Sequence, residues 1–306
     1  MKTLLAVLSL IVAFTASAQA DTIQVDDTFT NAQKWLNEKK FAVTGGPNGA
    51  RDDEAAFNQK ALLFYGEAVG NPEHRIPAQR EINAKRAAVV TAQRALAEYL
   101  EGFALVGDTQ VKDGMVQYDV IRSTVSGFVK GSQVVFQDYS KDKDTAIAFV
   151  KLGLHGPKGF ASAIYEKMLN DPNAKESLKT DKPAFKAPPV KLDEAYDGLI
   201  IDATEQNFRP ALINRIFATK GDVLYDPAKV SQKVLVEQGC GEYTNSVDKA
   251  KAALETRGVK NPLVVKASGA TTVADLQVTD NDAVTIYSAN QKGNFFSSAK
   301  VAFVLK

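Results

Sequence analysis

The 306-residue sequence is poor in the residue types on which most metal sites and many active sites depend. It contains one cysteine, Cys240, and two histidines, His74 and His155, which lie far apart in the chain. A single cysteine excludes an internal disulfide, and neither a His-x-x-x-His nor a Cys-x-x-Cys spacing occurs. We therefore predict no metal site, no cofactor and no catalytic residue, and we expect that the protein is not an enzyme.

Two interpretations of Cys240 stay open. It lies between two glycines, which indicates a turn with a buried or idle thiol, and an intermolecular disulfide is the alternative. Cys240 and His155 could also act as a nucleophile and its base, because such pairs form in space and need no fixed spacing in the sequence.

Charge of either sign is not in excess. The full chain has a formal net charge of +1, and Lys2 is the only charged residue among the first twenty, so the remainder carries 36 basic and 36 acidic residues. Binding to nucleic acid or to an anionic membrane surface needs a marked basic excess. Neither kind of partner is predicted.

Long apolar runs are limited to one, at residues 4–16, and it is too short to span a bilayer. A positive start precedes it, and residues 18–20, Ala-Gln-Ala, match the small-x-small pattern of a secretory cleavage site. We expect residues 1–20 to be a signal peptide cleaved near Ala20, with a membrane anchor as the alternative. Residue 21 is Asp, so no lipid-anchored cysteine begins the mature chain. We expect a periplasmic or secreted protein without a transmembrane segment.

The hydrophobic patterns predict an α+β fold, in which a helix packs on a mainly antiparallel sheet and a second, smaller α+β domain follows. The main helix is predicted over residues 78–101. Alanines on its apolar face would let its backbone approach a sheet closely. Further helices are predicted over residues 28–40, 54–69 and 160–169, and antiparallel strands over residues 115–122, 127–137 and 145–154, the last of them central.

A proline-rich, charged stretch is predicted to separate the two domains. The expected organisation is a signal peptide (1–20), an N-terminal helical extension (21–70), a helix-on-sheet domain (71–170), a Pro-rich linker (171–197) and a second domain (198–306). In the second domain, strands are predicted over residues 198–203, 211–218, 263–267 and 300–305, and a helix over 246–257 with Ser246 as N-cap. Residues 283–289 fit a helix or a strand.

Three residues of the second domain are candidates for ligand binding. Asp202 ends an apolar strand, and Glu205 and Arg209 follow it closely, so the three could line a site at the strand end. The structural alternative is that Asp202 or Glu205 pairs with Arg209 or accepts hydrogen bonds from the amides of the loop.

Small-residue patterns in both halves resemble known bacterial families. In the first half they are residues 84–88, Ala92, residues 95–98, Gly102 and residues 127–131. This half resembles the envelope family of small surface lipoproteins and the N-terminal domain of flagellar assembly protein T. In the second half, residues 198–203, 209–212, 261–265 and 280–283 resemble an uncharacterised bacterial domain often joined to it. The resemblance implies a non-enzymatic role in the envelope or in an appendage, although the lipidation cysteine of the family is missing.

We therefore expect a non-enzymatic, periplasmic or surface protein of the bacterial cell envelope. It would act by binding other envelope or appendage proteins, with flagellar or surface-appendage assembly as the process that the resemblance implies. A periplasmic small-ligand-binding protein is the alternative, and an uncharacterised hydrolase is a lesser one. The sequence does not define the oligomeric state.

Overall fold

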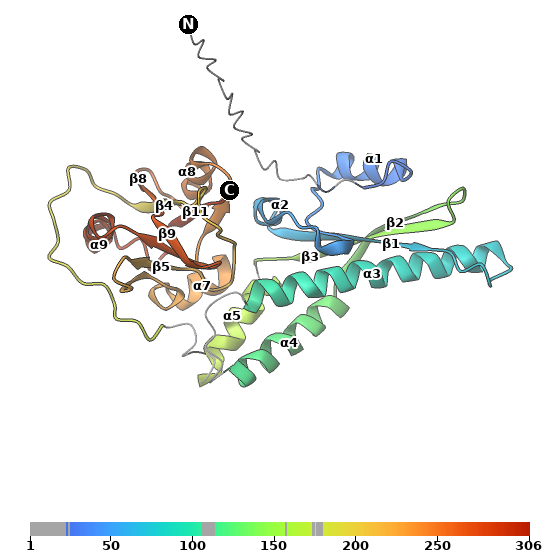
Figure 1. Cartoon of the computed structure of the whole chain (residues 1–306), viewed down its shortest axis with the longest axis horizontal. Helices are drawn as coiled ribbons and strands as arrows, with labels where there is room; N and C mark the ends of the chain where they lie inside the picture. The colour runs from blue at the N-terminus through green and yellow to red at the C-terminus, as the bar shows by residue number, and fades with distance from the viewer. Residues whose placement is uncertain (1–22, 24, 106–113, 157, 173–174, 176–179) are drawn as a thin grey trace, which may run out of the picture.

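The computed structural model describes residues 23, 25–105, 114–156, 158–172, 175 and 180–306. The predicted signal peptide, residues 1–20, lies outside them. The fold is a mixed α+β fold, as the sequence predicts. An N-terminal part, up to residue 170, is built around one sheet, and a C-terminal part, from residue 198, contains two (Figure 1). The predicted domain boundaries stay a prediction.

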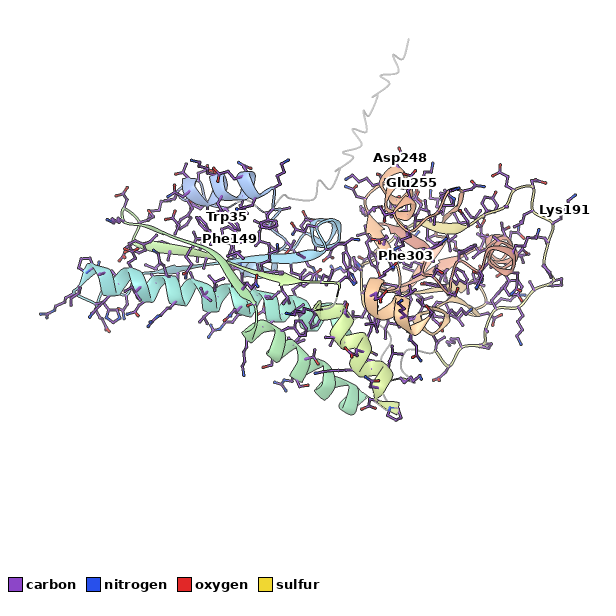
Figure 2. The ribbon with its side chains drawn as sticks, turned by 180° about the vertical axis from the view of Figure 1, so that it is seen from behind. Trp35, Phe149, Lys191, Asp248, Glu255 and Phe303 are labelled. Atoms are coloured by element: carbon purple, nitrogen blue, oxygen red, sulfur yellow. The ribbon has the colours of Figure 1, made fainter. Side chains whose placement is uncertain are left out.

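The sheet of the N-terminal part is a layer between helices. Its strands β1 (Ala61–Val69), β3 (Thr145–Gly153) and β2 (Gln133–Ser140) lie antiparallel in that order, so β3 is central, as predicted. Helix α1 (Thr30–Lys39) covers one face and α3 (Pro77–Leu105) the other (Figure 1). Alternate residues of β3 face opposite sides. Phe149 packs against Trp35 under α1 (Figure 2), whereas Ala148 packs against Ala88 of α3.

Close approach of α3 to the sheet depends on small residues on both sides. Ala84, Ala88 and Ala92 of α3 are buried, which confirms the predicted role of the alanine face. On β1, a Cβ added to Gly66 would lie 2.3 Å from the backbone nitrogen of Ala92 and 2.4 Å from the carbonyl oxygen of Ala88. Only glycine therefore fits at this point of β1 without moving the helix.

The predicted helix over residues 54–69 is wrong for most of its length. After a short 3₁₀ turn, η1 (Pro47–Gly49), the helix α2 (Asp53–Asn58) ends before β1. Asp52 caps α2, since its Oδ1 accepts a hydrogen bond from the Ala55 nitrogen at 2.9 Å. The run that follows is apolar at every position from 61 to 64, so its periodicity does not distinguish a buried strand from a helix. Residues 61–69 form a strand because they pair with β3 along their whole length. They therefore belong to the sheet and not to an N-terminal helical extension.

The predicted strand over residues 115–122 is also wrong, as is the start of the one over 127–137. A helix, α4 (Gly114–Lys130), occupies the first range and the beginning of the second, and β2 starts at Gln133. The alternation that suggested a strand is short, whereas Val125, Phe128 and Val129 continue at helical spacing and pack on the core. Phe128 contacts Phe160 of α5 (Phe160–Asn170), a helix that the sequence predicts correctly, at 5.5 Å between ring centroids.

From residue 180 to residue 197, the predicted linker contains no helix and is hydrogen-bonded to the C-terminal part. Phe185 donates its backbone N–H to Val223 at 2.9 Å, and Val223 donates to Pro183 at 2.8 Å. Further along, the Val190 nitrogen donates to Ser288 Oγ at 2.9 Å. This segment runs around the outside of the C-terminal part (Figure 1).

The C-terminal part combines a parallel sheet with a mixed one. The parallel sheet has the order β7 (Glu242–Thr244), β11 (Val301–Val304), β4 (Gly198–Asp202), β8 (Pro262–Lys266). The mixed sheet has the order β6 (Val223–Tyr225), β5 (Arg215–Ala218), β10 (Asp275–Val278), β9 (Gly269–Thr272). The helices are α7 (Gln232–Gln238), α8 (Val247–Glu255), α9 (Asp280–Gly293) and the 3₁₀ turn η2 (Pro227–Lys229).

Most sequence predictions for this part are confirmed. They include β4, β8, β11 and α8, whose N-cap Ser246 accepts a hydrogen bond from the Lys249 nitrogen at 3.3 Å. Of the strand predicted over 211–218, only residues 215–218 are a strand. The ambiguous residues 283–289 lie in α9, which is capped by Thr279. Within the described ranges, no helix is both long and apolar enough to cross a bilayer.

The two parts share one hydrophobic core. Phe57 of α2 packs against Tyr243 of β7 at 4.4 Å between ring centroids. Tyr165 of α5 donates a hydrogen bond from its hydroxyl to the carbonyl of Leu212. All four residues belong to a single cluster of buried side chains that continues into both parts.

Gly66→Ala should lower the free energy of unfolding by about 3 kcal/mol, because the new methyl group meets helix backbone that cannot turn away. The control is Gly153→Ala at the end of β3, where an added Cβ has no atom within 4 Å. The control should be neutral or stabilise by up to about 1 kcal/mol. Urea unfolding of both variants measures the difference, and equal stabilities would show that α3 does not approach β1 so closely.

Candidate functional site

Two of the three predicted ligand-binding residues make local contacts at the carboxyl end of β4 and β8. Asp202 Oδ1 accepts hydrogen bonds from the backbone nitrogen and the hydroxyl of Thr204, at 3.1 and 2.7 Å. Glu205 Oε1 lies 2.6 Å from Lys266 Nζ, and both side chains are more than half exposed. Asp202 therefore caps the loop after β4, and Glu205 forms a surface ion pair.

The third predicted residue, Arg209, has no described contact with the other two. Its side chain is exposed, and its backbone nitrogen donates to the Val273 carbonyl at 2.7 Å. Across the residues that the structure describes, neither Asp202 nor Glu205 pairs with it. Its positive charge acts instead on Asp53 of the N-terminal part. Burial raises the pKa of the Asp53 carboxyl group. A hydrogen bond from the Tyr99 hydroxyl and the positive charges of Arg51 and Arg209 oppose that rise. The three residues do not converge on one site.

A cleft of about 720 Å³ lies where the two parts meet. The N-terminal part supplies Phe57, Lys60, His155 and Gly156, and the C-terminal part supplies Val234, Glu237, Gln238, Glu242, Thr256, Arg257, Ser298 and Lys300. This size falls within the range of small-molecule sites, roughly 300–1,000 Å³. The cleft is therefore the candidate site of this structure.

His155 enters the cleft because β3 ends in a tight glycine turn. Gly156 has φ +94° and Gly239, which follows α7, has φ +74°, values that favour glycine. A Cβ on Gly239 would lie 3.0 Å from His155 Cε1, so the imidazole of the N-terminal part packs on the backbone of the C-terminal part. Gly156 is therefore a turn residue directly after His155.

The electrostatic surroundings keep His155 neutral. Burial, the larger cause, and the positive charges of Arg257 and Lys60 together lower the pKa of the imidazole to about 4. Its Nδ1 is buried and has no hydrogen-bond partner within the described part of the chain. A neutral imidazole offers one N–H donor and one acceptor nitrogen.

Cys240 is buried, as the first interpretation of this thiol predicts. Its Sγ lies 3.5 Å from the carbonyl oxygen of Leu212 and 3.8 Å from the hydroxyl of Tyr243. Its partners are therefore core groups of the C-terminal part, and no described hydrogen bond joins it to His155. The described residues also contain no group of three or more side chains placed to hold a metal ion.

Arg257 holds together the wall of the cleft that the C-terminal part supplies. Its Nε and Nη2 lie 2.8 and 2.7 Å from Glu242 Oε1. Nη1 donates to the Ala299 carbonyl at 2.7 Å, and Nη2 donates to the Gln238 carbonyl at 3.0 Å. The guanidinium therefore forms hydrogen bonds with β7, with the end of α7 and with the loop before β11.

Three charged side chains of the cleft form no ion pair among the described residues. They are Lys60, Lys300 and Glu237. Sequence reasoning missed this set because its members come from distant segments, and each of them alone has the pattern of an ordinary surface residue. The site can offer ammonium groups, a neutral imidazole, hydroxyls and the apolar side chains of Phe57 and Val234 to a ligand.

The comparisons with known proteins concern the C-terminal part. Residues 198–306 match the family described as Treponema pallidum Tp0624, second domain. This match agrees with the predicted resemblance of this half to an uncharacterised bacterial domain. No curated protein matches the chain. The resemblance of the first half to small surface lipoproteins and to flagellar assembly protein T receives no support from the comparisons.

Arg257→Gln should lower the free energy of unfolding by about 3 kcal/mol, because it leaves Glu242 and two carbonyl groups without their buried partner. Lys266→Gln is the control, since it removes one cation from the exposed pair with Glu205 and should change stability by less than about 1 kcal/mol. Chemical unfolding measures both values. Losses of equal size would mean that Arg257 does not hold this wall together.

Proposed function

We propose that the protein is a non-enzymatic component of the bacterial cell envelope that acts by binding other envelope or appendage proteins. The location rests on the expected signal peptide, and flagellar or surface-appendage assembly is the process that the family resemblance implies. The structural observation that supports protein binding is the open edge of the sheet in the N-terminal part.

The two edges of that sheet differ in how they are covered. Along β1, the Thr44 nitrogen donates to the Leu63 carbonyl at 2.8 Å, and the Tyr65 nitrogen donates to the Gly45 carbonyl at 3.1 Å, so residues 44–45 cover part of this edge. Strand β2 pairs with β3 on one side only. Among the described residues, no other segment forms backbone hydrogen bonds with its outer side.

An open edge offers backbone N–H and C=O groups to an extended segment of another protein. Val134 of β2 is 47% exposed, so an apolar side chain accompanies these groups. The register of β2 against β3 shifts between Val134 and Phe136. Such a bulge limits pairing with an arbitrary strand and favours a segment that fits it.

A periplasmic small-ligand-binding protein is the second candidate function. The cleft between the two parts favours it, and the residues concerned are Lys60, His155 and Lys300 instead of Asp202, Glu205 and Arg209. A hydrolase that uses Cys240 and His155 is not favoured, because the buried thiol contacts Leu212 and Tyr243.

A photo-crosslinking residue at position 134 should capture an envelope protein in intact cells, because a strand bound to β2 would lie within its reach. The matched control is the same residue at position 90 on α3, where Val90 is also 47% exposed. Mass spectrometry of the adducts identifies the partner. Equal capture at both positions, or capture at neither, would contradict protein binding at the β2 edge.

A further inference from the structure

Two lysines line the cleft, one from each part of the chain. Lys60 lies between α2 and β1 of the N-terminal part, and Lys300 directly precedes β11 of the C-terminal part. Neither is ion-paired within the described residues, whereas Arg257, which also lines the cleft, is bound to Glu242. Of the two acidic residues that line the cleft, Glu242 is therefore neutralised, and Glu237 is opposed by two cations.

The electrostatic potential at His155, in the same cleft, is positive. The charges that act on its imidazole come from Arg257 and Lys60, and both disfavour a second proton on the ring. The ring remains neutral and keeps an N–H donor, while its buried Nδ1 has no described partner. A neutral donor near the cations Arg257 and Lys60 suits an anion, because it adds a hydrogen bond without adding a charge that burial would oppose.

We propose that this cleft binds a small molecule with a terminal oxyanion, a phosphate or a carboxylate, held between Lys60 and Lys300 with His155 as a third contact. Phe57 and Val234 supply apolar surface for the remainder of the ligand, and Ser298 and Gln238 supply polar groups. Since each lysine comes from a different part, the ligand would bridge the junction. The proposal is independent of protein binding at β2, which lies in the N-terminal part away from the cleft.

The presence of only two histidines makes the test direct. Ring signals of the full chain are followed by NMR at pH 6.5 and constant ionic strength, with inorganic phosphate in one titration and succinate in the other. His74→Gln assigns the remaining signal to His155. We expect saturable shifts of the His155 signals and none of His74, and the anion that binds more tightly identifies the class. The bound anion should raise the pKa of His155, because a negative neighbour favours the charged imidazolium.

Variants show whether the two lysines hold the anion. Lys60→Gln and Lys300→Gln should each raise the Kd about tenfold, the effect of one lost charge-assisted contact. The control is Lys191→Gln, an equal change of charge at the far end of the C-terminal part (Figure 2). Trp35 fluorescence verifies that each variant is folded. The proposal is overturned if neither anion moves the His155 signals, or if Lys60→Gln and Lys300→Gln bind as Lys191→Gln does.

Discussion

The arrangement of this protein depends on the contact between α2 and α5 on one side and β7 and the loop after β4 on the other. The rings of Phe57 and Tyr243 pack against each other in a tilted arrangement across this junction, and Tyr165 donates a hydrogen bond to the Leu212 carbonyl. An aromatic pair of this kind contributes about 0.5–1.5 kcal/mol beyond the area it buries. Because these residues belong to one cluster, the two parts form a single packed unit, and the cleft has walls with fixed positions.

Local sequence patterns predict the elements whose hydrophobic period is unambiguous. The alanine face of α3, the apolar run of β3 and the cap of α8 all lead to correct predictions. The errors arise where the apolar residues of a short segment fit both the period of a helix and the period of a strand. Residues 61–69 become a strand because β3 pairs with them along their whole length, and α4 is a helix because its later turns pack on the core. Both decisions depend on tertiary contacts that a sequence window does not contain.

The candidate site could not be predicted in the same way. Asp202, Glu205 and Arg209 are close in sequence, and this proximity made them candidates. In the structure, Asp202 caps its own loop, Glu205 pairs with Lys266, and Arg209 is bound through its backbone to Val273. Lys60, His155 and Lys300 are far apart in sequence and meet only because the two parts pack together. One signal was present in the sequence, since glycines flank His155 and turn the chain sharply after β3. That signal indicates a turn and does not reveal what the turn faces.

One measurement tests the central claim, that the two parts form one unit. The chain contains a single tryptophan, Trp35, under α1, and a single cysteine, Cys240, buried in the C-terminal part. Urea unfolding can therefore be followed in each part separately, by tryptophan fluorescence and by pulse labelling of the thiol. The shared core predicts that both signals change at the same urea concentration. Labelling of Cys240 at a clearly different urea concentration from the loss of the Trp35 signal would contradict it.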